Sequence, residues 1–509
     1  MRALSPDFKA YGWAPSTAEI ARLAGVDPFQ VLRYDGNVPP APLPSSRPGA
    51  FAGKLAEINE YPHGGYGALV PAIARYAGVE PENVVLGAGA DDLILLCARA
   101  FAGPGDTVAI AQEPTYPLFR IAAWLAGAEV GAAEPTMTFA CRPNNPSGAL
   151  DELPAERPLV VDEAYHEYAG ETAAGLLEDG VVVIRTFSKA FGLAGARVGY
   201  ALADRDTADE LNARQAPAPI STLSAALALA ALASPPDVSR DVEERERLAG
   251  ALRAIGLEPL PSRTNFLYVP VEDGESLGEQ LLRQGLAVRT FPDAIRISVR
   301  DREDDDVLID AIARSLDRPS PVGALGGRRA RHVRATAETQ VRVRLALDGA
   351  SQVRVATGAG IYDHFLEQLA FHAGLDLVLE AAGDLETGPH HTAEDSALAL
   401  GEALDLALGD RRGIARYGDA VVPMDDALAR AAVDLGGRPW CELELACDPG
   451  LAGHVLQSLA QAGRLGLHVT ASGSDEHHVA EAAFKAVGRA LRAAVRSESV
   501  GIPSTKGRL

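Results

Sequence analysis

The sequence predicts an α/β fold for the N-terminal part of the chain and a duplicated sheet-and-helix fold for the C-terminal part. Short apolar runs, such as 158–161 (PLVV) and 181–184 (VVVI), alternate with longer Ala- and Leu-rich periodic stretches up to about residue 316. This alternation is typical of strands followed by helices. Beyond residue 366 one series of motifs occurs twice, which indicates an internal duplication.

The composition is that of a globular protein with several domains. Hydrophobic residues make up 47% and charged residues 23% of the 509 positions, which excludes collagen-like, coiled-coil and disordered classes for most of the chain. At ordinary domain sizes this length corresponds to about three domains. The net charge of −22 repels nucleic acid and acidic membrane surfaces. We therefore expect small molecules as binding partners, and neither nucleic acid nor a membrane.

Cysteine usage and the N-terminal segment indicate a cytoplasmic protein. None of the four cysteines belongs to a C-x-x-C pair, and so few cysteines suit a reducing compartment. The N-terminal segment MRALSPDFKAYGW lacks the apolar stretch of a signal peptide. The longest apolar run, 225–233, has nine residues, about half of the ~18 that a membrane-spanning helix requires.

A change of composition predicts a domain boundary. The segment 317–332 (DRPSPVGALGGRRARH) is rich in Pro, Gly and Arg, as exposed linkers between domains often are. We expect one domain over 1–316, a linker over 317–332 and a second domain over 333–509. The basic run 328–331 could bind a phosphate, but we interpret it as a solvated segment that leads into the next strand.

Side chains at the ends of the two apolar runs indicate chemistry on a Schiff base. Asp162 and Tyr165 follow the first run, and Lys189 follows the second within five residues. A lysine can form an imine with a carbonyl cofactor, and a carboxylate can keep the pyridine nitrogen of such a cofactor protonated. The glycine-containing turn 87–92 and Arg197 could hold a phosphate. Each feature alone is also typical of a cap, a turn or a surface lysine, so the inference depends on their order and spacing.

A series of motifs connects these residues from about Tyr34 to Val299: YDGNVPP, YPHGGYGAL, LGAGADD, EPTYP, RPNNPSG, VDEAY, RTFSKAFGLAGARVGY and IRISV. The series resembles the pyridoxal-phosphate aminotransferases of the aspartate-aminotransferase fold, in particular histidinol-phosphate aminotransferase. The resemblance implies a fold-type I transferase with a large mixed-sheet domain and a small α/β domain. It also implies pyridoxal 5'-phosphate as the cofactor and transamination as the reaction.

The resemblance implies a role for each matching residue. Lys189 would be the Schiff-base lysine, and Asp162 would bind the pyridine nitrogen. The other cofactor-binding residues would be Ala90, Asp91, Tyr116, Asn145, Tyr165, Ser188 and Arg197, with Tyr61 contributed by a second subunit. Arg289 and Arg296 would be the substrate-phosphate and anion arginines, and Asn37 would lie at the substrate.

Departures from this family bear on substrate specificity. The stretch between Tyr116 and Asn145 is shorter than is usual in the family, which predicts that a helix of the large domain is trimmed. The interval between Arg289 and Arg296 is also short, and DGNVPP replaces an acidic N-E-N-P motif. A related decarboxylase of threonine phosphate shares much of the pattern and stays an alternative. A second alternative is a cofactor-free scaffold that aids assembly of the other domain, although the intact lysine and aspartate argue against it.

Two copies of an H-H-x-x-E motif predict a metal site in the C-terminal domain. They are His390, His391 and Glu394 in the first copy and His477, His478 and Glu481 in the second. On a helix we expect the second histidine and the glutamate, three residues apart, to share a face while the first histidine points elsewhere. Two such helices facing each other could bind two ions. His364 and His468 would add one ligand to each, whereas we interpret His372 and His454 as packing or surface residues. Imidazole and carboxylate ligands without thiolate favour Mn²⁺, or alternatively Fe²⁺, over structural zinc.

Further motifs extend from Arg334 to Leu509: RATAET, YDHFLEQLAFHAGLDL, GDL, HHTAEDSALALGEAL, RRGIARYG, VPMDDAL, DLGGRPW, LGLHV, HHVAEAAFKA and PSTKG. They closely resemble imidazoleglycerol-phosphate dehydratase. The resemblance implies a duplicated α+β domain of two sheet-and-helix repeats with two Mn²⁺ ions. Glu338 would transfer the proton, with Glu394 and Glu481 as alternatives. The substrate phosphate would bind Arg416, Arg438, Lys485, Ser504 and Lys506. Phe365, Asp475 and the pair 388–389 depart from the family without removing a ligand.

Together the two resemblances imply two consecutive steps of histidine biosynthesis in one chain. The dehydratase would convert imidazoleglycerol phosphate into imidazole acetol phosphate. The aminotransferase would convert that product into histidinol phosphate with glutamate as amino donor. Because the dehydratase family forms trimer-based shells and the aminotransferase family forms dimers, we expect a large homo-oligomer that satisfies both symmetries.

Overall fold

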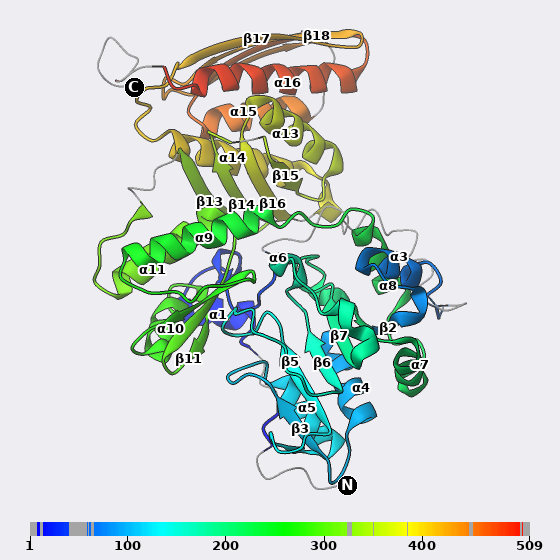
Figure 1. Cartoon of the computed structure of the whole chain (residues 1–509). Coiled ribbons are helices and arrows are strands. Elements are labelled where there is room, and N and C mark those ends of the chain that lie inside the picture. The colour runs from blue at the N-terminus through cyan, green and yellow to red at the C-terminus, as the bar shows by residue number, and fades with distance from the viewer. Residues whose placement is uncertain are drawn as a thin grey trace. The chain divides into compact units, whose positions relative to one another are not determined.

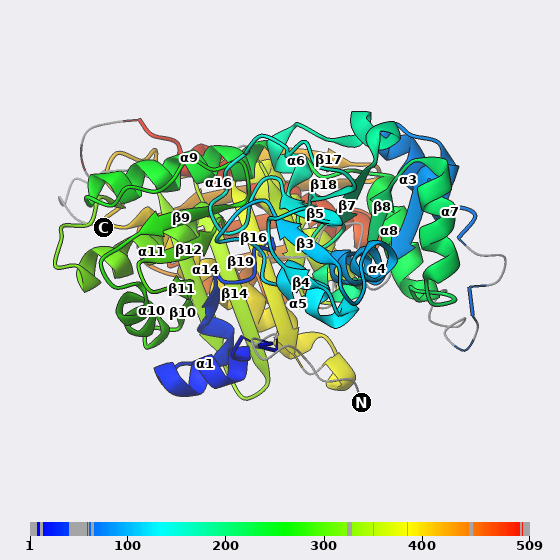
Figure 2. The ribbon, with the colours of Figure 1, turned by 60° about the horizontal axis from the view of Figure 1, so that its bottom comes forward.

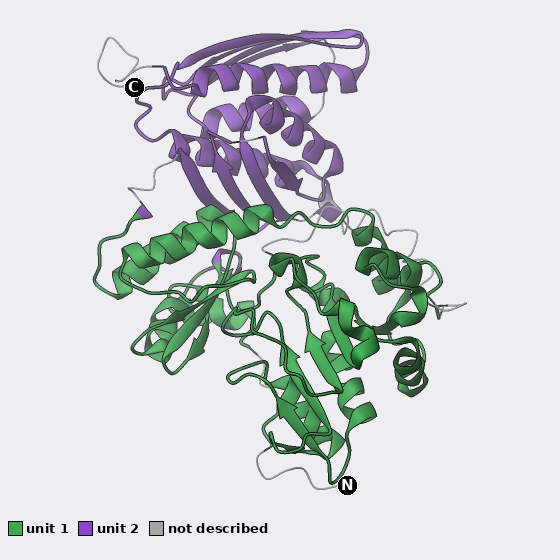
Figure 3. Cartoon of the chain, in the orientation of Figure 1, with its two compact units in different colours: residues 1–26, 31–321 green, residues 27–30, 322–509 purple. Residues whose placement is uncertain are grey.

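The computed structural model of the protein divides into two compact units (Figure 3). One comprises residues 1–26 and 31–321, and the other comprises residues 27–30 and 322–509. The structure describes residues 8–10, 14–39, 59, 61–62, 66–322, 328–349, 351–383, 385–446, 451–498 and 501. No helix within these residues has the length and apolar character needed to cross a membrane. Residues 323–327 of the expected linker lie outside the described residues, and the domain boundaries stay a prediction.

A seven-stranded mixed sheet forms the larger part of the first unit (Figure 1). Its strands, in spatial order, are β2 (Val84–Gly87), β8 (Gly199–Leu202), β7 (Val181–Thr186), β6 (Leu159–Asp162), β5 (Met137–Cys141), β3 (Thr107–Ile110) and β4 (Glu129–Val130). β8 runs antiparallel to β2 and β7, and the other neighbouring pairs are parallel. The mixed sheet confirms the predicted α/β class, and the two apolar runs named above form β6 and β7.

Helices cover both faces of this sheet, so its central strands are buried on both sides. Every residue of β6 and β7 is buried, which explains why their sequences are continuous apolar runs without alternation. One face packs against α4 (Ala90–Phe101), α5 (Leu118–Ala126) and α7 (Arg205–Arg214), and Figure 2 shows α5 beside β3 and β4. The other face packs against α3 (Leu69–Ala77), η5 (Ala174–Asp179) and α8 (Thr222–Leu232). Residues 131–136 join β4 to β5 without a helix, in agreement with the short interval noticed in the sequence.

A small antiparallel sheet forms the rest of the first unit. Its strands are β11 (Arg289–Phe291), β12 (Ala294–Ser298) and β9 (Phe266–Pro270). Helices α9 (Ser239–Ala254), α10 (Gly274–Leu282) and α11 (Arg302–Ser315) pack against this sheet or against one another. α1 (Thr17–Ala24) begins at a capping box between Ser16 and Glu19, and β1 (Leu32–Arg33) pairs with β10 (Leu286–Ala287). Short helices elsewhere in the chain are η1 (Pro28–Gln30), η4 (Pro81–Asn83), α6 (His166–Ala169), η6 (Ala194–Ala196) and η7 (Leu385–Thr387).

Two four-stranded sheets of the same topology belong to the second unit. The first has the order β13 (Arg329–Ala335), β14 (Thr339–Ala346), β16 (Asp376–Gly383) and β15 (Val353–Ala356). The second has the order β17 (Tyr417–Met424), β18 (Ala427–Asp434), β20 (Gly466–Ser472) and β19 (Trp440–Leu445). In both sheets the first three strands are antiparallel and the last strand pairs in parallel. The repeated topology confirms the internal duplication predicted from the sequence.

The helices of the two repeats pack against each other in one shared core. α13 (Gly360–Ala373) lies against α16 (Glu476–Val495), and α14 (His390–Leu408) lies against α15 (Leu451–Ala462). Two glycines at matching positions of the repeat permit these close contacts. A Cβ atom on Gly401 would lie 2.8 Å from the backbone oxygen of Leu459, and one on Gly488 would lie 2.4 Å from that of Leu369. Each helix pair therefore joins one element from each repeat.

Candidate active sites

The first site forms at the edge of the seven-stranded sheet where β6 and β7 end. Asp162 is the last residue of β6 and is in register with Ile184 of β7. Lys189 follows the end of β7 at Thr186. The carboxyl ends of neighbouring parallel strands meet at one edge of a sheet, and both side chains line one cavity of about 510 Å³.

This cofactor cavity gathers predicted site residues from distant parts of the first unit. Its lining includes Asn37, Ala90, Asp91, Tyr116, Asn145, Asp162, Tyr165, Ser188, Lys189, Arg197, Arg289 and Arg296. Tyr61, which is expected to act on a second subunit, is 80% exposed and does not belong to the described lining. The structure thus brings the predicted residues of one chain together, while their individual roles stay predictions.

Burial shifts the pKa values of the two central ionisable groups toward neutrality. Asp162 is 4% exposed, and its Oδ1 accepts a hydrogen bond from the backbone N–H of Ala164 at 3.0 Å. Loss of solvation raises the pKa of Asp162 to about 7. Burial, followed by the charge of Arg296, lowers the pKa of Lys189 to about 8. A buried carboxylate of this kind is stabilised by a cationic N–H partner, and an amine of this kind is a nucleophile near neutral pH.

Hydrogen bonds between distant segments orient Asn37 and Tyr165 beside the lysine. Asn37 Nδ2 donates to the Tyr165 hydroxyl at 3.0 Å, and Ser298 Oγ donates to Asn37 Oδ1 at 2.9 Å. Lys189 Nζ lies 5.7 Å from the centre of the Tyr165 ring. Ser298 was not identified from the sequence. It lies two residues after Arg296 and therefore on the same face of β12, which is the signal that could have identified it.

Arg296 links this cavity to two further segments. Its guanidinium donates hydrogen bonds to Asn145 Oδ1 and, at 2.9 Å, to the backbone oxygen of Asp35. The side chain is also stacked over the Phe266 ring, with 5.2 Å between the guanidinium carbon and the ring centre. Arg289 stands in register with Arg296 on the neighbouring strand. The two arginines predicted to bind substrate anions therefore lie on adjacent strands, one buried and one exposed.

The N-terminus of α4 forms a cradle for an anion. Gly89 precedes the helix with a φ of +85°, and a Cβ atom there would lie 2.6 Å from Arg197 Nη2. A Cβ atom on Gly199 would lie 2.8 Å from the backbone nitrogen of Ala90. Arg197 Nη2 binds Asp91 Oδ2 at 2.8 Å. Backbone N–H groups at a helix N-terminus together with an arginine are suited to a phosphate, and the glycines keep this space open.

In the second unit, a first group of metal-binding side chains lies between α13 and α16. His364 Nε2 and His477 Nε2 lie 3.6 Å and 3.2 Å from the two carboxylate oxygens of Glu481. The two imidazole rings are stacked, with 5.9 Å between their centres. Lys485 Nζ lies 2.8 Å from Glu481 Oε1. One ligand atom from each of the three acidic and imidazole side chains lies within 4.8 Å of the others, a spacing that one ion can bridge.

A second group lies between α14 and α15. His390 Nε2 and His454 Nε2 lie 3.6 Å and 3.3 Å from the carboxylate oxygens of Glu394, and these rings also stack, at 4.9 Å. His454 was interpreted from the sequence as a packing or surface residue, but it occupies a place equivalent to that of His364. The repeat contains the signal for this equivalence, because HFLEQLA (364–370) matches HVLQSLA (454–460).

The predicted orientation of the H-H-x-x-E motif is wrong. The first histidine of each pair, His390 or His477, faces the glutamate, and the second points elsewhere. Residues four apart on an α-helix are offset by about 40°, and residues three apart by about 60°. The second histidines contact the hairpin turns of the two sheets: His391 Nδ1 lies 3.6 Å from Glu338 Oε2, and His478 Nδ1 lies 2.7 Å from Asp426 Oδ1.

The remaining predicted residues are placed less uniformly. His468 Nδ1 lies on β20, 3.4 Å from Glu442 Oε2, and belongs to neither group among the described residues, so its role as a ligand stays a prediction. Arg416 Nε binds Asp434 Oδ1 at 2.7 Å, and Arg438 is exposed. Ser504 and Lys506 lie outside the described residues.

Two of the positions that depart from the family keep a structural role. Phe365 stacks on Phe484, with 5.1 Å between ring centres. Asp475 caps α16 by accepting a hydrogen bond from the backbone N–H of His478 at 3.1 Å.

Comparison with known families divides the chain in the same way. Residues 357–491 match the family "Imidazoleglycerol-phosphate dehydratase", and residues 34–158 and 139–312 match "Aminotransferase class I and II". The imidazoleglycerol-phosphate dehydratase of Methanothermobacter thermautotrophicus is 50% identical over 190 residues, which cover 36% of the chain and 98% of that protein. The dehydratase of Mycolicibacterium smegmatis is 47% identical over 206 residues, which cover 37% of the chain and 100% of that protein.

Solved structures resemble the N-terminal part. The histidinol-phosphate aminotransferase from Sinorhizobium meliloti, in complex with pyridoxal-5'-phosphate, has a TM-score of 0.51 and 26% identity and covers 62% of this chain and 96% of its own. The L-threonine-O-3-phosphate decarboxylase from Porphyromonas gingivalis has a TM-score of 0.51 and 20% identity, covers 57% of this chain and 100% of its own, and at that identity shares the fold alone. The chain therefore belongs to the imidazoleglycerol-phosphate dehydratase family through its C-terminal part and to the class I and II aminotransferase family through residues 34–312.

Proposed function

We propose that this one chain performs two consecutive steps of histidine biosynthesis. The C-terminal unit dehydrates imidazoleglycerol phosphate to imidazole acetol phosphate, and the N-terminal unit transaminates that ketone with glutamate to histidinol phosphate. The observation that carries the proposal is the presence, in one chain, of both sets of site residues. The product of the first reaction is the substrate of the second, so each half supports the interpretation of the other.

The cofactor cavity fits pyridoxal 5'-phosphate. Asp162 would bind the pyridine nitrogen, and the N-terminus of α4 with Ser188 and Arg197 would hold the phosphate. Asn145 and Tyr165 would bind the phenolic oxygen, and Tyr116 would lie on the ring, with Tyr61 supplied by a second subunit. When bound, the cofactor withdraws electrons from the reacting carbon of the substrate. The burial of Asp162 and the open glycine cradle support this assignment.

The chain's own residues bind the substrate and move the proton. Lys189 would be the covalent partner of the cofactor and would carry a proton to and from the substrate carbon, a role that its lowered pKa favours. Arg289 and Arg296 would bind the anionic groups of the substrates. Asn37, which accepts a hydrogen bond from Ser298, would orient the amino group of the substrate beside Tyr165.

The two side-chain groups of the second unit fit two divalent ions. His364, His477 and Glu481 would hold one, and His390, Glu394 and His454 the other, with His391, His468 and His478 as further proposed ligands. Mixed nitrogen and oxygen donors favour Mn²⁺, or alternatively Fe²⁺. Such ions stabilise negative charge on the imidazole of the substrate as a C–H proton is lost.

Proton transfer in the dehydration is assigned first to Glu338. It lies on the turn between β13 and β14, 3.6 Å from His391, within reach of the metal-binding helix. Glu394 and Glu481 stay alternatives, although each already faces two imidazoles. Arg416, Arg438, Lys485, Ser504 and Lys506 would bind the phosphate of the substrate.

We also propose the organisation of the protein. One domain would span 1–316 and the other 333–509, joined by the linker 317–332, in a large cytoplasmic homo-oligomer. The linker is too short and polar to form a sealed tunnel, but it keeps the two sites at a raised mutual concentration. Any gain in passing imidazole acetol phosphate between the sites is therefore modest.

The test uses the full chain loaded with Mn²⁺ and pyridoxal phosphate. Imidazoleglycerol phosphate and glutamate should yield histidinol phosphate and 2-oxoglutarate, and omission of glutamate should stop the reaction at imidazole acetol phosphate. A visible absorption band that borohydride reduces should accompany the bound cofactor. Accumulation of the ketone in the presence of glutamate, without such a band, would establish the scaffold alternative. Release of carbon dioxide from threonine phosphate would establish the decarboxylase alternative.

A further inference from the structure

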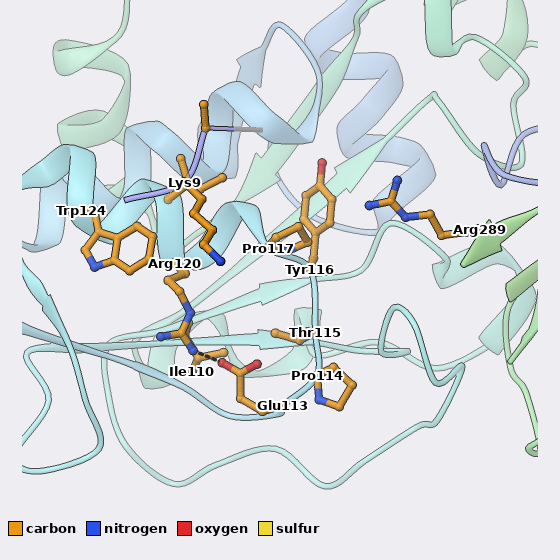
Figure 4. A pocket seen from close by; sticks show the side chains of 12 residues that line it. Lys9, Ile110, Glu113, Pro114, Thr115, Tyr116, Pro117, Arg120, Trp124 and Arg289 are labelled. Atoms are coloured by element: carbon orange, nitrogen blue, oxygen red, sulfur yellow. Dashed lines mark hydrogen bonds and ion pairs between the residues drawn. The ribbon is translucent and has the colours of Figure 1, made fainter. Parts of the chain in front are cut away.

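A second cavity lies in the first unit on the far side of Tyr116. Its volume is about 490 Å³, and its described lining includes Lys9, Glu113, Tyr116, Arg120, Trp124 and Arg289. None of Lys9, Arg120 and Trp124 has a role in the proposed reactions. Figure 4 shows Lys9 and Arg289 pointing toward Tyr116 from opposite sides. This outer cavity therefore has charged walls that the proposed mechanism does not explain.

The outer cavity carries an excess of positive charge. Among its described lining residues, Lys9, Arg120 and Arg289 are cations and Glu113 is the one carboxylate. Arg120 binds Glu113 and lies over Trp124, with 5.9 Å between the guanidinium carbon and the ring centre. The contact with the indole ring thus restricts the orientation of the Arg120 guanidinium. The net formal charge of the lining is +3 − 1 = +2, which is complementary to a phosphate monoester at neutral pH.

The outer cavity shares lining residues with the cofactor cavity. Thr115, Tyr116, Pro117 and Arg289 belong to both. Tyr116 donates a hydrogen bond to Asp91 Oδ1 at 2.9 Å, which holds its ring at the boundary. Arg289 lines both cavities, whereas its register partner Arg296 is among the described lining residues of the cofactor cavity alone. A substrate with its reacting carbon near Lys189 can therefore extend past Tyr116 toward Arg289.

We infer that the outer cavity binds the phosphate end of the transaminated substrate, and that Lys9 and Arg120 are specificity residues for phosphate esters. The inference rests on the proposed transamination and deepens it. Arg289 alone was expected at the phosphate from the sequence, and the cavity adds two cations from the N-terminal segment and α5. Tyr116 and Trp124 line the same space.

The test compares phosphorylated and unphosphorylated substrates in the full chain. The variants are Lys9→Gln, Arg120→Gln and their combination, with Arg99→Gln, an exposed arginine of α4 outside the cavity, as the matched control. The double variant should raise the KM for histidinol phosphate by about 10-fold or more, because charge-assisted hydrogen bonds are lost. The KM values for histidinol and glutamate should change by less than about twofold, within the range of ordinary surface substitutions. Glu113→Gln should leave the KM for histidinol phosphate unchanged or lower it.

Other outcomes would overturn the inference. An unchanged KM for histidinol phosphate in the double variant would exclude Lys9 and Arg120 from phosphate binding. An equal rise in the KM for glutamate would assign the cavity to the carboxylate of the amino donor.

A titration that needs no turnover separates this inference from the proposed function. Inorganic phosphate should change the fluorescence of Trp124 in the wild type, and the change should disappear in the double variant and in Trp124→Phe. A wild type that does not transaminate histidinol phosphate would refute the proposed function, and the titration would still decide whether the cavity binds phosphate. Absence of any fluorescence response to phosphate in the wild type would refute the inference.

Discussion

The two units prepare their reactive groups in different ways. In the first unit a single cavity collects residues from many elements, and burial adjusts the pKa values of Asp162 and Lys189. In the second unit the reactive groups occur twice, at two helix pairs related by the repeat. Their imidazoles are partly exposed, as with His390, whose side chain is 59% exposed. Burial thus prepares acid–base groups in one unit, whereas duplication supplies matching metal ligands in the other.

Because the two sets of reactive groups belong to different units, we expect that each activity can be removed without loss of the other. Among the residues that the structure describes, the lining of the cofactor cavity lies in the first unit and both groups of metal-binding side chains lie in the second. Substitutions in the first unit and removal of metal from the second therefore test whether the two units act independently.

The largest effect is expected for Lys189→Ala. Transamination should be abolished, since loss of proton transfer alone costs about 100- to 10,000-fold. The visible band of the bound cofactor should disappear, while dehydration of imidazoleglycerol phosphate continues at the wild-type rate. Parallel assays of both reactions check this expectation. A matching fall in dehydration would show that the units are coupled.

Removal of metal should have the reverse effect. Chelation should abolish dehydration and loosen the assembly, because the ligands join separate elements, whereas transamination should persist. Elemental analysis after reconstitution should find about two Mn or Fe ions per chain, one for each three-residue group. One ion or fewer per chain would contradict the proposal that each of the two groups binds an ion.

Asp162→Ala tests how much the buried carboxylate contributes to turnover in the first unit. The cofactor should still bind and absorb, but turnover should fall by about 100-fold or more, as when a preorganised electrostatic partner is removed. Rapid-scan spectra and steady-state rates together separate binding from turnover. A variant that loses the cofactor entirely would instead give Asp162 a role in retention.

His454→Ala tests whether the repeat is functional. It should remove one ion and reduce dehydration by at least the 10- to 100-fold typical of changes around a metal, and His364→Ala should do the same at the other group. His372→Ala, a histidine of α13 outside both groups, serves as the control. Unequal losses for His364 and His454 would show that the two groups are not equivalent.

The smallest effect concerns pH. Because burial lowers the pKa of Lys189 to about 8, the neutral form of the amine becomes about tenfold more abundant for each unit that the pH rises toward that value. The rate at which cofactor-free protein takes up pyridoxal phosphate should therefore rise about tenfold per unit up to pH 8 and level off above it. Stopped-flow absorbance measures this rate. A rise that continues to pH 10 would indicate an ordinary, solvated lysine.

Local patterns in the sequence determined much of the architecture. The apolar runs of β6 and β7 predict strands of an α/β fold, and the repeated motifs predict an internal duplication, because both signals depend on residues close together in the chain. The spacing of Asp162 and Lys189 after those strands predicts one shared site for the same reason. The glycines Gly401 and Gly488 appear in the repeat, and the structure explains them by the close approach of the paired helices.

Tertiary packing determines those features of the sites that the spacing of residues in the sequence does not specify. The membership of His454 in a metal-binding group depends on the contact of α15 with α14, which are separate in the sequence. The choice of the first histidine over the second depends on which face of each helix meets its partner. The outer cavity with Lys9 and Arg120 exists because the N-terminal segment and α5 both meet Tyr116. Such contacts form between distant segments only after folding, so the composition and periodicity of one segment cannot specify them.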